Sequence, residues 1–104
     1  MQVVAEEAWD WFLFDDAGNL YLDVLVEHGA ISYTVTAELN ADQRNDYARN
    51  GMACVSALAA QMRYQAMMRQ WSAPKLPSEW SQRSTAAVHA WQKRRSERSN
   101  GGDE

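Results

Sequence analysis

The sequence has few of the residues that mark specialised classes of protein. One cysteine, two prolines and five glycines occur among its 104 residues. A single cysteine excludes a disulfide-stapled scaffold, and so little glycine and proline excludes a collagen-like or low-complexity chain. No stretch approaches the ~20 consecutive apolar residues of a membrane-spanning helix, so we expect no membrane segment.

The residues that are abundant indicate a folded domain. Hydrophobic residues make up 46% of the chain and aromatic residues 11%, among them five tryptophans. Intrinsically disordered chains are poor in such residues, and the length suits one small domain. Each large aromatic side chain buries roughly 150–250 Å² when packed. A core of this size cannot hold all of them, so we expect some to contact a partner.

The charge is distributed unevenly along the chain. The net charge is −4, but residues 1–50 hold ten acidic and two basic residues, whereas residues 51–104 hold four acidic and eight basic residues. Near the N-terminus the acidic Glu6 and Glu7 stand where a secretion signal would have a basic segment followed by an apolar stretch, which predicts a cytoplasmic protein. We interpret the lone Cys54 as a small hydrophobe on a helix, with a reactive thiol as the alternative.

Three segments have the pattern of antiparallel strands. Residues 9–14 are rich in aromatic side chains, residues 20–27 alternate in polarity, and residues 31–38 alternate more strictly. Turn-forming residues separate them at residues 15–19 and at His28-Gly29. We therefore predict a three-stranded antiparallel β-meander with one buried and one largely solvated face.

A long helix is predicted after the meander. Asn40 and Gln43 have the spacing of a capping box. The apolar stripe that follows consists of Tyr47, Gly51, Cys54, Val55, Leu58 and Met62. No stop signal precedes Ser72, and a helix from Ala41 to Trp71 would be about 46 Å long. Since one small sheet cannot cover it, the helix either breaks near Met62 to Gln65 or projects. Gly51 within the stripe suggests a close approach of helix to sheet.

A proline-containing linker, residues 72–77, precedes a second predicted helix. Its apolar side is formed by Trp80, Ala87, Val88 and Trp91, with Ser84 between them. The predicted fold class is α+β: a three-stranded meander packed on a long helix, plus this C-terminal helix. We assign residues 1–91 to a single domain and residues 92–104 to a basic, disordered tail.

The sequence contains no recognisable catalytic or metal-binding motif. Its carboxylate pairs are Glu6-Glu7, Asp15-Asp16 in a solvated turn, and Asp10 with Asp23 on adjacent strands, none in a recognisable catalytic setting. Neither His28 nor His89 has a nucleophile or metal ligand at a known spacing. We predict a protein that is not an enzyme and that needs no cofactor or metal.

The aromatic strand leaves one question open. Alternation places Trp9, Trp11 and Leu13 on one face and Phe12 and Phe14 on the other, so both faces are apolar. One set is therefore exposed, covered by the second helix, or covered by a partner protein.

The order of these features resembles small bacterial α+β proteins of immunity or uncharacterised type that are encoded beside secreted toxins. The resemblance covers about half of the chain, from Phe12 to Met62. The features concerned are a hydrophobic strand, an Asp-Ala-Gly-Asn turn, two alternating strands, a Leu-x-x-x-Gln helix start, Tyr47-x-x-x-Gly51 and Leu58-Ala59. It implies a cytoplasmic acidic protein that binds and masks a toxin, and it assigns no functional residues.

The first functional hypothesis is a protein-binding module, such as an inhibitor or immunity-type protein, whose partner has a basic surface. The predicted partner-binding residues are Asp15, Asp16, Asp23, Glu27, Trp9 and Trp11. A concentrated acidic surface accelerates capture of a cationic partner.

Two alternatives use the C-terminal half of the chain. The first is a nucleic-acid-associated or regulatory protein that acts through Lys93, Arg94, Arg95 and Arg98. The acidic N-terminal half opposes this reading, because it would repel phosphate. The second alternative is a homodimer that associates through Met67, Met68 and Trp71.

Overall fold

The computed structural model describes the backbone of residues 1–102 and the side chains of residues 1–97. In this part of the chain the strands are β1 (Gln2–Glu7), β2 (Trp11–Asp16), β3 (Asn19–His28) and β4 (Ile31–Glu38). The helices are α1 (Ala41–Asn50), α2 (Met52–Met67) and α3 (Trp80–Gly102). None of these helices is long and apolar enough to cross a membrane.

The four strands form one antiparallel sheet in the order β1-β2-β3-β4. Strands β2, β3 and β4 confirm the predicted meander, and an Asp15 carboxylate accepts a 2.9 Å hydrogen bond from the Gly18 amide in the predicted turn between β2 and β3. Strand β1 was missed by the sequence analysis. Its sequence does not alternate cleanly, and its pairing with β2 shifts register between Val3 and Ala5. The meander therefore has four strands and not three.

The predicted long helix is two helices. The capping box is present, because Asn40 and Gln43 exchange two 2.8 Å hydrogen bonds between side chain and backbone. The helix ends at Gly51, however, and not near Met62 to Gln65. Gly51 has φ 68° and ψ −145°, a conformation that only glycine adopts readily. Apart from the glycine and its two neighbours in the chain, no residue has an atom within 4 Å of the position that a Cβ would take there, so the expected close approach to the sheet is wrong.

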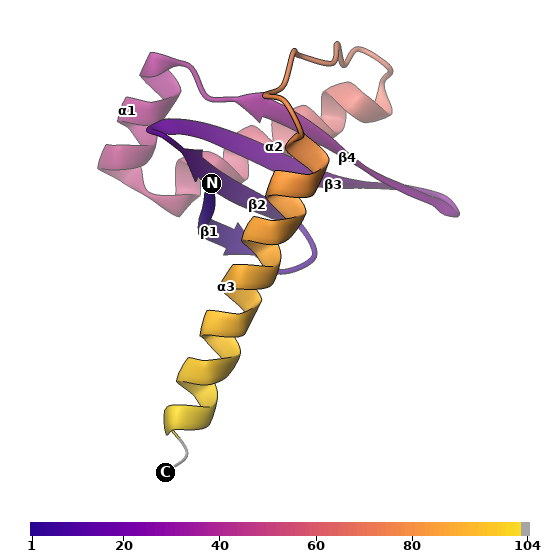
Figure 1. Ribbon diagram of the computed structural model, residues 1–104. Coiled ribbons are helices and arrows are strands. Elements are labelled where there is room, and N and C mark those ends of the chain that lie inside the picture. The colour runs from indigo at the N-terminus through magenta and orange to yellow at the C-terminus, as the bar shows by residue number, and fades with distance from the viewer. Residues whose placement is uncertain (103–104) are drawn as a thin grey trace.

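The molecule has three layers, with helices on both faces of the sheet. Figure 1 shows α2 behind the sheet and α3 in front of it. One buried cluster joins α2 to the sheet and includes Trp11, Leu22 and Val55; a second joins α3 to the other face and includes Phe14 and Ala87. Of the three possibilities left open for the aromatic strand, coverage by the second helix is the one observed.

Helix α3 extends beyond the sheet that it covers (Figure 1). Its first half packs on the sheet through Trp80, Ala87, Val88 and Trp91. It then continues as a helix through residues 92–102, where the sequence analysis predicted a disordered tail. The segment between Gln92 and Glu97 consists mostly of Gln, Lys, Arg and Glu, which are good helix formers. Its side chains are exposed.

Candidate binding groove

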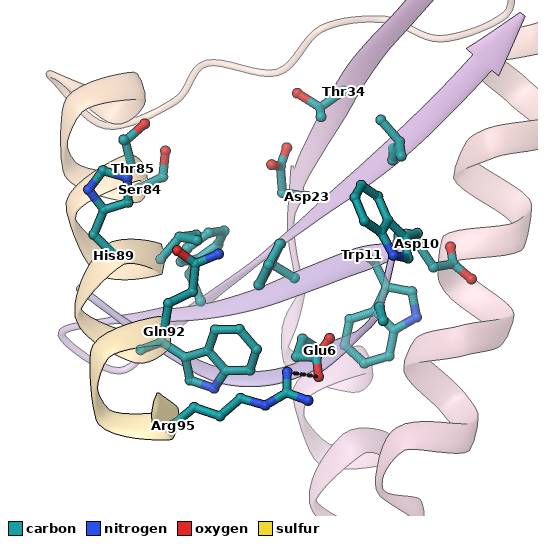
Figure 2. Close-up of a pocket in the computed structure, with 17 residues that line it drawn as sticks. Glu6, Asp10, Trp11, Asp23, Thr34, Ser84, Thr85, His89, Gln92 and Arg95 are labelled. Carbon is teal, nitrogen blue, oxygen red and sulfur yellow. Dashed lines mark ion pairs between the residues drawn. The ribbon is translucent and has the colours of Figure 1, made fainter. Parts of the chain in front are cut away.

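A groove lies between α3 and the half of the sheet that α3 leaves uncovered. Strands are about 4.8 Å apart, so a four-stranded sheet is about 15–20 Å wide, whereas one helix is about 10 Å across. Helix α3 packs mainly on the β1 and β2 side, through residues such as Val3 and Phe14. Beside the helix is a groove of about 570 Å³, and residues of all four strands line it, among them Glu6, Phe12, Asp23 and Thr34 (Figure 2).

Part of the groove lining is apolar and comes from both the sheet and α3. Phe12 packs edge-on against Trp91, with ring centroids 5.6 Å apart and planes at 85°. Leu25 from β3 and Val88 from α3 extend this surface. The same aromatic contacts dock α3 onto β2, so the packing that holds the helix also forms the apolar lining of the groove.

Asp23 is a carboxylate within this groove. Figure 2 shows its side chain pointing from β3 into the space between the sheet and the Ser84 and His89 side of α3. Register places Asp23 opposite Thr36, whose hydroxyl donates a 2.6 Å hydrogen bond to Asp23 Oδ1. Among the described side chains, no Lys, Arg or His lies within 4.0 Å of this carboxylate. Asp23 therefore has hydrogen-bond support without a countercharge.

Burial raises the pKa of Asp23 above its ordinary value, while the hydroxyl groups of Thr36 and Thr34 act in the opposite direction. Because the folded state holds this proton more tightly than the unfolded chain, the contribution of the group to stability is greatest below the unfolded pKa. That contribution is lost as the pH rises through the raised pKa of the folded protein.

The Asp23→Asn variant should reveal this linkage, because asparagine does not titrate. We expect the free energy of unfolding of the wild type, measured relative to that of the variant, to fall as the pH rises from about 4. Urea unfolding of both proteins across this pH range measures the difference. Other titrating groups cancel in the comparison, so a difference that stays flat or grows with pH would contradict the expectation.

The other charges around the groove are already paired. Arg95 lies 3.9 Å from Glu6 and also sits over the Trp91 ring, 5.3 Å from its centroid. Asp10 forms an ion pair with Arg63 of α2. Asp23 is therefore the carboxylate of the groove that has no cationic neighbour among the described side chains.

The structure separates the predicted acidic residues. The Asp15 carboxylate accepts a hydrogen bond from the Gly18 amide within its own turn, and Asp16 forms an ion pair with Arg83 of α3 at 2.6 Å. Asp23 lies in the groove, and Glu27 is exposed in a smaller adjoining recess. Only Asp23 and Glu27 therefore face open space near the groove.

The two predicted partner-binding tryptophans have opposite environments. Trp9 lies in the turn between β1 and β2 with φ 63° and is 92% exposed. Trp11 is 1% exposed in the core between the sheet and α2, and its indole Nε1 has no hydrogen-bond partner. Trp9 borders both the groove and the adjoining recess, so it is the tryptophan that a partner could reach.

Apart from Arg95, which lines the groove, the described residues of the two alternatives lie elsewhere. Met67 and Met68 are exposed at the end of α2, whereas Trp71 is half-buried against the α2 side of the core. Lys93, Arg94 and Arg95 are exposed on α3. The side chain of Arg98 lies outside the described residues.

Sequence reasoning missed the polar wall that α3 contributes to the groove. This wall is formed by Ser84, Thr85, His89 and Gln92. The four residues recur at helical spacing, a signal that was available in the sequence. Without knowledge of which sheet face α3 covers, such a polar stripe is indistinguishable from an ordinary solvated helix face.

The described side chains include neither an activated cysteine nor a metal-binding cluster. Burial raises the pKa of the Cys54 thiol, and the nearby Asp46 carboxylate raises it further, so this cysteine is not an activated thiolate. No group of three or more His, Cys, Asp or Glu residues among the described side chains is placed to hold a metal ion. Comparison of the chain with protein-family models, curated proteins and solved structures finds no match.

Proposed function

We propose that this protein is a cytoplasmic, non-enzymatic protein-binding module that uses the groove beside α3, and that it acts as an inhibitor of immunity type. The observation that supports this proposal best is Trp9, a tryptophan 92% exposed at the end of an open groove. Exposed tryptophan is uncommon on monomeric surfaces, and tryptophan is strongly enriched among the residues that dominate binding energy at interfaces.

The charges near Trp9 favour a cationic partner. Asp23 in the groove and Glu27 in the adjoining recess are acidic and lie outside the ion pairs of the described side chains. The N-terminal half of the chain, which supplies the sheet, carries ten acidic and two basic residues. Opposite charge on a partner would accelerate association, as expected of an inhibitor that must capture its target quickly.

Site-specific photocross-linking in the source cell would test the proposal. A photoreactive amino acid at position 9 should capture a discrete protein, because Trp9 is exposed beside the groove. Position 64 on α2 provides the matched control. Tyr64 is also exposed, but α2 covers the face of the sheet opposite to the one that α3 and the groove occupy. We then expect Trp9→Ala to weaken binding of the captured protein by at least about thirtyfold, as for an interface hot spot. Equal capture from positions 9 and 64, or capture from neither, would contradict the proposal.

A further inference from the structure

We propose that Asp23 anchors a lysine or arginine side chain of the partner, with the aliphatic stem of that side chain lying on the apolar lining of the groove. This inference rests on the proposed function and names the chemistry that its site recognises. The geometry behind it is a carboxylate in a groove of about 570 Å³, hydrogen-bonded on one oxygen by Thr36 and directed into the open space.

A cation satisfies Asp23 better than the neutral groups around it. An ionised carboxylate that is partly withdrawn from water is costly unless it is paired. The hydroxyl of Thr36 gives a hydrogen bond but no charge. Arg95 and Arg63, the basic residues nearest the rim, are engaged with Glu6 and Asp10. No Lys, Arg or His among the described side chains lies within 4.0 Å of Asp23, so the place beside this carboxylate is open to a cation of the partner.

The groove also suits the stem of a long basic side chain. Lysine and arginine bury their methylene groups along apolar surface while the charged head finds a polar partner. Here Leu25, Phe12 and Val88 provide such a surface beside Asp23. The contact of Arg95 with the Trp91 ring shows that an aromatic side chain of this groove already accepts a guanidinium group.

The openness of the groove favours a residue of a protein over a free amine. The groove and the adjoining recess share Trp9, Asp10 and Leu25, so the two form a continuous surface. A small amine would touch only a fraction of this surface and could not bind tightly there. A basic side chain on a protein would instead gain from the contacts that its neighbours make with Trp9.

Titrations followed by amide NMR shifts would test the anchor directly. The probes are N-acetyl-lysine N-methylamide, its neutral isostere N-acetyl-norleucine N-methylamide, n-butylammonium, and a pentapeptide with lysine between alanines. We expect the lysine amide to shift the amides of Leu25 and Thr34 saturably, with a Kd of about 1–10 mM. The norleucine amide should bind at least about tenfold more weakly, and the pentapeptide more tightly than n-butylammonium.

The Asp23→Asn variant should lose the lysine-amide response by about tenfold or more. Glu38→Gln is the matched control, because Glu38 is an exposed acid on the neighbouring strand β4 that lines neither the groove nor the adjoining recess, and it should retain the response. Asp23→Ser serves as a second variant in case the first fails to fold, since serine can still pair with Thr36.

An undiminished response in the folded Asp23 variants, or equal binding of the norleucine amide, would overturn the anchor. Binding of n-butylammonium as tight as that of the pentapeptide would overturn the assignment to a protein side chain. The outcome is separable from that of the proposed function. A partner captured from position 9 without any cation response at Asp23 removes the anchor alone, whereas a cation response without any captured protein removes the proposed function.

Discussion

Replacing Trp11 with alanine should lower the free energy of unfolding by about 3–5 kcal/mol, whereas replacing Trp9 with alanine should change it by less than about 0.5 kcal/mol. The two residues are two positions apart and share a predicted strand face. Trp11 is 1% exposed and packs in the cluster between the sheet and α2. Trp9 is 92% exposed, so its removal creates no cavity.

Phenylalanine at position 11 refines this expectation. The indole Nε1 of Trp11 is buried without a hydrogen-bond partner, so Trp11→Phe loses volume but no hydrogen bond. We expect it to retain much of the stability that Trp11→Ala loses. Urea unfolding followed by far-UV circular dichroism measures all three variants without relying on tryptophan fluorescence. Equal destabilisation by the Trp9 and Trp11 alanine variants would contradict the structure of this strand.

This contrast shows where sequence reasoning stops. Aromatic composition correctly predicted β2, and alternation correctly predicted β3 and β4, because these segments have apolar side chains to bury and turn residues between them. Alternation also assigned Trp9 to the strand, but the chain turns there with a positive φ, and the aromatic side chain escapes the core. A tryptophan has no strong local preference for a turn, so its own identity gave no warning.

The wrong prediction of where the long helix breaks also comes from a backbone conformation that the residue pattern does not reveal. Gly51 fits the apolar stripe of a continuous helix, and its spacing from Tyr47 and Cys54 is correct for one. A glycine within a helical pattern can mark an end or a packing contact, and the pattern does not distinguish these. In the structure Gly51 has a positive φ, so helix α1 ends before it. Helix α2 follows and packs Val55 and Met62 in the core against the sheet.

The candidate site depends on tertiary structure and was only partly predictable. The prediction of one largely solvated sheet face is wrong, because α3 covers part of it and buries Tyr21, so Asp23 on this face is only partly exposed. Its setting comes from Thr36 on the neighbouring strand and from α3, which covers Tyr21 of β3 but leaves Asp23 on the same strand facing the groove. No local pattern in residues 78–91 states which face of the sheet the helix covers or how far it reaches.

The docking of α3 can be tested by adding a charge at one position of the helix. Ala87 is 5% exposed and packs in the cluster with Val3, Phe14 and Tyr21, whereas the adjacent Ala86 is exposed. In Ala87→Asp an unpaired carboxylate would have to be buried, so we expect a loss of about 3–5 kcal/mol of docking free energy. Ala86→Asp introduces the same charge one residue away and should cost about 0.5 kcal/mol or less.

Because the α3 cluster is separate from the α2 cluster, the helix can detach while the other face of the sheet stays packed. Near-UV circular dichroism should then show loss of the ordered environment of Trp80 and Trp91, which contact Phe14 and Phe12. The lysine amide should no longer bind to Ala87→Asp although Asp23 is unchanged, because the groove has lost its α3 wall. If Ala87→Asp and Ala86→Asp unfold alike, or if binding survives detachment, then α3 does not form the site, and the sheet alone must account for any recognition at Asp23.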